Sequence, residues 1–83
     1  MYKIEIFPSA DKSLKRIIAR DRSAIAKAIY KLAENPRYHG YKKLKDSDLY
    51  RIRVGDYRVV YQIDDNNLLV VVVRIGHRRE IYR

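Results

Sequence analysis

Two runs near the middle of the chain alternate apolar side chains with basic or polar ones. They are residues 49–54 and 57–62, and Gly55-Asp56 separates them. Alternation at period two is typical of a strand with one buried face. Glycine at the first central position of a two-residue loop suits a type II′ turn. The sequence therefore predicts a β-hairpin, and its register follows by counting outward from the turn.

The predicted register gives the hairpin one apolar face and one basic face. It contains five cross-strand pairs: Val54–Tyr57, Arg53–Arg58, Ile52–Val59, Arg51–Val60 and Tyr50–Tyr61. A slip by one residue would bury the arginines, so the apolar face fixes this register. Arg51, Arg53 and Arg58 then share the face that points away from the core.

Arg53 and Arg58 are directly opposed in this register. Like charges in that position destabilise a sheet by up to about 1 kcal/mol. An anion lying across the pair would offset the repulsion, so the pattern favours an anion-binding surface. The alternative is a basic sheet face that is only solvated.

The N-terminal half predicts a strand followed by two antiparallel helices. Residues 2–7 alternate and are rich in β-formers, and the proline that follows ends the strand. Ser9 is the expected N-cap of the first helix. The second helix is expected to begin at Asp21 or Ser23 and to end before Pro36. Each helix has an apolar stripe, formed by Ala10, Leu14, Ile17 and Ile18 in the first and by Ile25, Ala28, Ile29 and Leu32 in the second.

The C-terminal half predicts a basic loop and three strands. Residues 37–47 are polar and basic, with Leu44 expected to hold the loop to the core. The hairpin follows, then a turn at residues 64–67. The apolar residues 68–75 come next and predict a strand that is covered on both faces or lies in the middle of the sheet. Helices between one strand and a run of strands pack on one sheet face. We therefore expect a single α+β domain over residues 1–83, with the element order β-α-α-β-β-β. The antiparallel helix pair covers one face of a small, mainly antiparallel, twisted four-stranded sheet, and the opposite face is open and basic.

Charge and composition narrow the classes of partner. Lys and Arg total 19 against 10 Asp and Glu, and the formal net charge of +9 points to nucleic acid, an acidic protein or an anionic membrane. There is no Cys, which excludes disulfides, thiolate metal sites and a thiolate nucleophile. The longest apolar run, residues 68–73, is too short to span a bilayer, and no signal peptide is evident. A cytoplasmic protein is expected.

Five short segments carry a family resemblance through their order and spacing. They are Leu44-Lys45, residues 49–53, 57–61 and 74–78, and Ile81-Tyr82. Together with the order of elements, they make the whole chain similar to the RelE/ParE toxin superfamily, and specifically to the RelE-like mRNA interferase branch of type II toxin–antitoxin systems.

The resemblance implies an activity and a set of partners. The activity is that of a ribosome-dependent endoribonuclease that cuts messenger RNA in the decoding site and needs no metal or other cofactor. The implied partners are a cognate acidic antitoxin, the ribosome and messenger RNA. The resemblance implies no contact with a membrane. It implies contact with DNA only through the complex with the antitoxin.

The resemblance also implies roles for individual residues. Arg51 and Arg53 fall where the family has basic residues on the second strand, and Arg58 matches the arginine that steadies the phosphate in the transition state. Arg78 matches a residue proposed as the acid for the leaving group, and Tyr82 matches a tyrosine that stacks on or orients a base. The best-studied relatives carry lysine where this chain has Arg51 and Arg53. Because an arginine with a pKa above about 12 makes a poor base, the identity of the base stays open.

The reaction that the resemblance implies needs no metal, and the arginines suit it chemically. The 2′-hydroxyl attacks the neighbouring phosphate, and cations placed where negative charge builds would supply most of the acceleration. Arginine suits this task because its planar fork grips a phosphate through two hydrogen bonds. Arg51 and Arg53 lie about 6–7 Å apart on one strand face, and Arg58 opposite completes a cradle. DNA lacks the 2′-hydroxyl and should not be cut.

The remaining candidate residues each have a second interpretation. His77 has a suitable pKa range for a base or an acid, or it is packed or solvated. Tyr82 could stack on a base or hold the C-terminus against the sheet. The loop lysines would contact RNA phosphates without sequence preference or form a solvated basic loop; they are Lys42, Lys43 and Lys45.

Two other functions stay open on the sequence alone. One is a non-catalytic toxin of the ParE type that inhibits DNA gyrase. The other is a basic RNA-binding module. Cut messenger RNA in a translating extract would distinguish the nuclease, and arrest of growth on expression would distinguish a toxin from a binding module.

Overall fold

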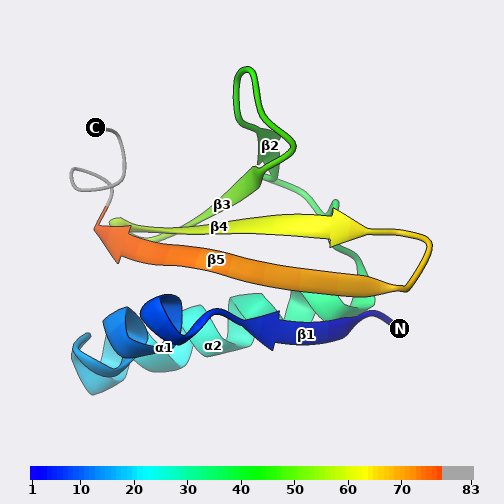
Figure 1. The fold of residues 1–83 in the computed structure, drawn as a ribbon. Helices are drawn as coiled ribbons and strands as arrows, with labels where there is room; N and C mark the ends of the chain where they lie inside the picture. The colour runs from blue at the N-terminus through cyan, green and yellow to red at the C-terminus, as the bar shows by residue number, and fades with distance from the viewer. Residues whose placement is uncertain (78–83) are drawn as a thin grey trace.

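The computed structural model describes residues 1–77 of the chain. Figure 1 shows two helices on the same side of a mixed β-sheet. The elements in chain order are β1 (Lys3–Ile6), α1 (Pro8–Lys15), α2 (Ala19–Glu34), β2 (Lys42–Lys43), β3 (Tyr50–Val54), β4 (Tyr57–Asp64) and β5 (Leu69–His77). This arrangement confirms the predicted α+β class.

Within the described residues the sheet has five strands, one more than predicted. The strand order is β1-β5-β4-β3-β2, with β1 parallel to β5 and the other pairs antiparallel. The additional strand, β2, lies inside the predicted basic loop and pairs with the outer edge of β3. Its two exposed lysines carry no alternation that could reveal a strand. β5 lies between β1 and β4, which is one of the two placements that its apolar sequence predicted.

The helix boundaries differ from the predicted ones. α1 begins at Pro8, with Phe7 rather than Ser9 at the N-cap. Proline is favoured at the first helical position because its φ angle suits a helix and its missing N–H would have no partner there. The helix ends before Ile17 and Ile18, which lie in the short connection to α2; Ile17 is still buried, whereas Ile18 is 60% exposed.

α2 begins at Ala19, ahead of the predicted start at Asp21 or Ser23, because the connection from α1 occupies only residues 16–18. It runs for 16 residues and ends at Glu34, before Pro36 as predicted. Neither helix of the described part is long and apolar enough to cross a membrane.

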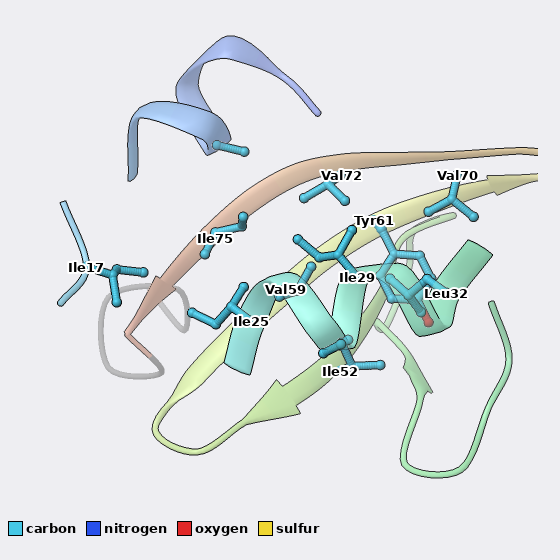
Figure 2. Packing of buried hydrophobic residues seen from close by; sticks show 12 residues of the cluster. Ile17, Ile25, Ile29, Leu32, Ile52, Val59, Tyr61, Val70, Val72 and Ile75 are labelled. Atoms are coloured by element: carbon cyan, nitrogen blue, oxygen red, sulfur yellow. The ribbon is translucent and has the colours of Figure 1, made fainter. Parts of the chain in front are cut away.

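The core lies between α2 and the sheet, as Figure 2 shows. Ile25, Ile29 and Leu32 of α2 belong to one buried cluster with side chains of β3, β4 and β5. The labelled sheet residues of that cluster are Ile52, Val59, Tyr61, Val70, Val72 and Ile75. Each fully buried aliphatic side chain contributes roughly 1.5–3 kcal/mol. This burial fixes which face of the hairpin meets the helices, and the arginine face must turn away from them.

A charged cluster connects the N-terminal segment to the turn between β4 and β5. Arg37 donates hydrogen bonds to both carboxylate oxygens of Asp65, at 2.8 and 3.1 Å, and the Tyr2 hydroxyl donates another at 2.5 Å. The hydrogen bond from Arg37, and then that from Tyr2, lower the pKa of Asp65 to about 2. Because Arg37 and Asp65 are both exposed, water and salt weaken this cluster.

We expect the Asp65→Asn variant to be less stable than the wild type at pH 7, with most of this difference gone at pH 2. The pKa of Asp65 in the folded protein lies below its ordinary value of about 4. Its charge therefore stabilises the fold above about pH 4, and this contribution is lost as the pH falls through about 2. Urea unfolding midpoints at the two pH values measure the effect, with Glu5→Gln as the control for loss of an exposed carboxylate. Equal midpoints for Asp65→Asn and the wild type at pH 7 would contradict the prediction.

Candidate functional site

The described part of the sheet carries a group of cations on the side turned away from the helices, and we call this side the basic face. Strand pairing puts them in two neighbouring cross-strand rows. The first row is Arg53, Arg58 and Gly76, and the second is Lys42, Arg51, Val60 and Arg74. The rows are two residues apart along β4, which is about 6–7 Å.

The hairpin has the predicted register. All five predicted pairs form, including Arg53 opposite Arg58. Gly55 has a φ angle of 59°, and Asp56 is not among the residues with positive φ, as a type II′ turn requires. Alternation and turn chemistry were therefore enough to put the three hairpin arginines on one face.

Arg58 is buried, contrary to the expectation that its side chain faces solvent. Only 2% of the residue is exposed. It lies on the central strand β4, between Arg53 of β3 and Gly76 of β5. Arg53 is exposed. Solvent therefore reaches the basic face at Arg53 but hardly at Arg58.

Arg51 also departs from the expected open cradle of three arginines. It is 8% exposed, and its Nη1 donates a hydrogen bond at 3.1 Å to the carbonyl oxygen of Gly40. Gly40 has a φ angle of 96°, which glycine adopts without the steric cost that other residues meet. Arg51 therefore holds the connection between α2 and β2 against the sheet.

Arg74 joins the basic face because of a β-bulge that the sequence did not reveal. Val60 pairs with Arg74 but Tyr61 pairs with Val72, so Val73 is an extra residue in β5. A bulge of this kind reverses the alternation of faces along a strand. Without it, Arg74 would face the helices. The surrounding run is almost wholly apolar, so a one-residue shift leaves no trace in the pattern.

His77 lies on the opposite side of the sheet from the hairpin arginines. It pairs with Tyr57, and the two rings meet edge to face with centroids 5.8 Å apart and an interplanar angle of 77°. Tyr57 packs against the core, which places its face toward the helices. The structure therefore does not bring His77 to Arg58, because His77 is one strand position past Gly76 and side chains alternate.

The three loop lysines are separated. Lys42 pairs with Arg51 and shares the basic face, whereas Lys43 pairs with Tyr50 and lies on the other face. Lys45 follows β2 in the loop, and all three lysines are exposed. Arg78 and Tyr82, the two remaining candidates, lie outside the described residues.

The basic face has the chemistry of a phosphate-binding surface. Arg53, Lys42 and Arg74 present exposed positive charge in the two rows. Guanidinium groups bind phosphate through paired, charge-assisted hydrogen bonds. A buried guanidinium at Arg58 interacts with a nearby anion in a lower dielectric than water, which strengthens the attraction.

Comparison with known proteins identifies similar chains. A family described as "ParE toxin of type II toxin-antitoxin system, parDE" matches residues 4–82. The chain is 36% identical over 89 residues to putative toxin RelE4 of Methanocaldococcus jannaschii, covering 100% of this chain and 93% of that protein. It is 28% identical over 85 residues to mRNA interferase toxin RelE of Escherichia coli strain K12, covering 98% of this chain and 90% of that protein.

The fold is also similar to solved structures. One is the toxin–antitoxin complex RelBE2 from Mycobacterium tuberculosis, where the superposition has a TM-score of 0.84 at 28% sequence identity. It covers 93% of this chain and 98% of the other. The similarity in fold therefore extends over most of this chain and nearly all of the other.

Proposed function

Because the chain belongs to the RelE/ParE superfamily of type II toxins, we propose that it is an endoribonuclease that cleaves messenger RNA in the decoding site of the ribosome. A relative named as an mRNA interferase supports this activity. The observation that carries the proposal is the opposed pair Arg53–Arg58, with Lys42 and Arg74 in the neighbouring row. Two directly opposed arginines gather positive charge at one point of the face, and a phosphate that lies across them is attracted by both.

In the proposed reaction the RNA supplies its own nucleophile. The 2′-oxygen forms a bond to phosphorus while the bond from phosphorus to the 5′-oxygen breaks, which gives a 2′,3′-cyclic phosphate and a 5′-hydroxyl end. The 2′-hydroxyl gives its proton to a base, and the leaving 5′-oxygen takes up a proton. Negative charge grows on the phosphate oxygens, where fixed cations stabilise the transition state more than the ground state.

The residues divide this work between them. Arg53 binds the phosphate from the surface, and Arg58 stabilises the charge that develops on it. The resemblance to the family adds Arg78 as the proton donor to the leaving oxygen and Tyr82 as the residue that stacks on a base. Because arginine is a poor base, the rate enhancement rests mainly on electrostatic stabilisation and on alignment of the 2′-hydroxyl with the phosphate.

We further propose that the chain has a cognate acidic antitoxin. The solved Mycobacterium tuberculosis relative is a toxin–antitoxin complex. The net charge of +9 favours an acidic protein partner, because complementary charge increases the association rate and excludes wrong partners. The ribosome and messenger RNA are the other proposed partners.

Mapping of RNA ends in a translating extract tests the proposed activity. The purified toxin should produce new ends within translated codons, and no such ends should form when ribosomes are omitted. Co-addition of the antitoxin should stop the cutting. If translation stopped while every template stayed intact, the nuclease proposal would be wrong.

Inhibition of DNA gyrase is the second candidate function, because the matching family is described as ParE toxin. A supercoiling assay with the same preparation separates the two candidates. Cut messenger RNA with unaffected supercoiling supports the nuclease. Inhibited supercoiling with intact messenger RNA supports the gyrase inhibitor.

A further inference from the structure

A small apolar hollow opens on the basic face beside the second row of cations. Its volume is about 270 Å³, and it is lined by Leu44, Leu49, Val60, Val73 and Arg74. Val60 and Arg74 are cross-strand partners in that row. The backbone N–H of Leu44 donates a hydrogen bond at 2.8 Å to the carbonyl oxygen of Leu49. The hollow therefore lies where the loop after β2 meets β4 and β5.

The lining combines aliphatic side chains with one guanidinium group. Val60 is buried, Leu44, Leu49 and Val73 are half-buried, and Arg74 is exposed. Single exposed aliphatic side chains are ordinary on a domain of this size. Here they are gathered into one concave site that has a planar cation in its lining and further cations next to it.

We propose that this hollow binds one base of the RNA substrate, next to the phosphate that Arg53 and Arg58 hold. This inference rests on the proposed function and names a binding site within it. The base lies against the aliphatic side chains, and the guanidinium of Arg74 stacks on it, as arginine planes do on the unstacked bases of single-stranded RNA. Val60 is two residues from Arg58 along β4, about 6–7 Å, so the base belongs to a nucleotide that adjoins the cut.

An RNA base fits the hollow better than an apolar side chain of a protein partner. The neighbouring groups in the row are Lys42, Arg51 and Arg74, and this concentration of positive charge attracts a chain with a phosphate beside every base. The volume is below the roughly 300–1,000 Å³ of sites for drug-sized ligands, which suits a single flat ring system. An apolar side chain would fill the space but would make no use of the planar cation.

A site of this size also discriminates between bases. A larger or smaller ring system changes the contact with the aliphatic lining, and the difference acts at the step that selects where the RNA is cut. Val73 and Arg74 are therefore specificity-determining residues in this proposal.

End mapping on a messenger RNA library with randomised codons tests the inference. The wild type should show a base preference at one position beside the cut. Arg74→Ala should weaken that preference and lower cutting by about 5- to 150-fold, the range expected for loss of one stacking contact, and Val73→Trp, which fills the hollow, should also weaken the preference. Arg74→Lys keeps the positive charge but lacks the planar guanidinium group. Its base preference should therefore fall, while its total cutting stays closer to the wild type than that of Arg74→Ala. Lys27→Ala removes an exposed cation of α2 and should leave the profile unchanged.

Each outcome is decisive once circular dichroism shows that the variants are folded. Arg74 is exposed, so its removal leaves the core intact even if the tryptophan variant fails to fold. The inference is wrong if Arg74→Ala cuts RNA with the same base preference as the wild type. It is also wrong if the wild type shows no base preference beside the cut. In both cases the proposed function still stands. A wild type that cuts no RNA removes both. Weaker antitoxin binding in the variants with an unchanged profile assigns the hollow to a protein side chain and also overturns the inference.

Discussion

Replacing Arg58 with alanine should lower the rate of messenger RNA cleavage by about 10²–10³-fold, the usual cost of removing one preorganised group that stabilises transition-state charge. The effect should lie at the upper end of this range. Arg58 is only 2% exposed, and its charge acts in a lower dielectric than that of a surface arginine. Single-turnover cleavage on programmed ribosomes, with the toxin in excess, measures the chemical step.

The burial of Arg58 calls for variants that separate chemistry from folding. Arg58→Met keeps much of the side-chain volume without the charge, so it should match the activity of Arg58→Ala while its urea midpoint stays closer to the wild type. Arg58→Lys keeps the charge but loses the two-pronged grip on phosphate, so it should retain intermediate activity. Lys27→Ala is the control for loss of one positive charge. Full activity of the folded methionine variant would remove Arg58 from the mechanism.

A messenger RNA that carries a single 2′-deoxynucleotide on the 5′ side of the cut should not be cut at that position. The proposed nucleophile is the 2′-oxygen, and its removal leaves no group to attack the phosphate. Programmed ribosomes with matched ribose and deoxyribose templates measure the effect. A template with the deoxynucleotide one position further downstream should be cut at the normal rate.

The ends of the products give an independent check on this prediction. Internal attack leaves a 2′,3′-cyclic phosphate, whereas attack by water leaves a linear phosphate. Cutting at the 2′-deoxy position would show that water is the nucleophile. The proposed reaction, with the roles of Arg53 and Arg58 in it, would then be wrong.

The hairpin could be predicted from the sequence because two independent signals agree there. Alternation at period two fixes which face is buried, and the Gly55-Asp56 turn fixes where the count begins. The prediction that Arg51, Arg53 and Arg58 share a face followed from those signals and is confirmed by the strand pairing.

The burial of the arginine side chains could not be predicted in the same way. A pattern assigns a side chain to a face, but the neighbours decide how much of a long side chain is covered. Arg51 is covered because a carbonyl group from a loop 11 residues earlier accepts its hydrogen bond. Arg58 is 2% exposed and lies on the central strand β4, between β3 and β5. Both facts depend on contacts between segments that are distant in the sequence.

The bulge in β5 had the largest effect on the candidate site. One extra residue, Val73, moves Arg74 to the basic face and creates part of the hollow next to it. The pairing of β4 with β5 also puts His77 beside Tyr57, on the side of the helices. In an apolar run, a shift of one residue leaves the pattern unchanged, so neither placement could be read from the sequence.

The parallel pairing of β1 with β5 has a consequence for synthesis of the protein. Lys3 pairs with Leu69 and Ile6 with Val72, so β1 has no strand partner until β5 has been translated. Contacts this far apart in sequence also form late in folding, because closing a long loop costs entropy before the contact is made. A nascent chain whose β5 is still inside the ribosomal exit tunnel cannot complete the sheet that carries the arginines. The sheet that carries the arginines is therefore completed only after β5 has left the exit tunnel.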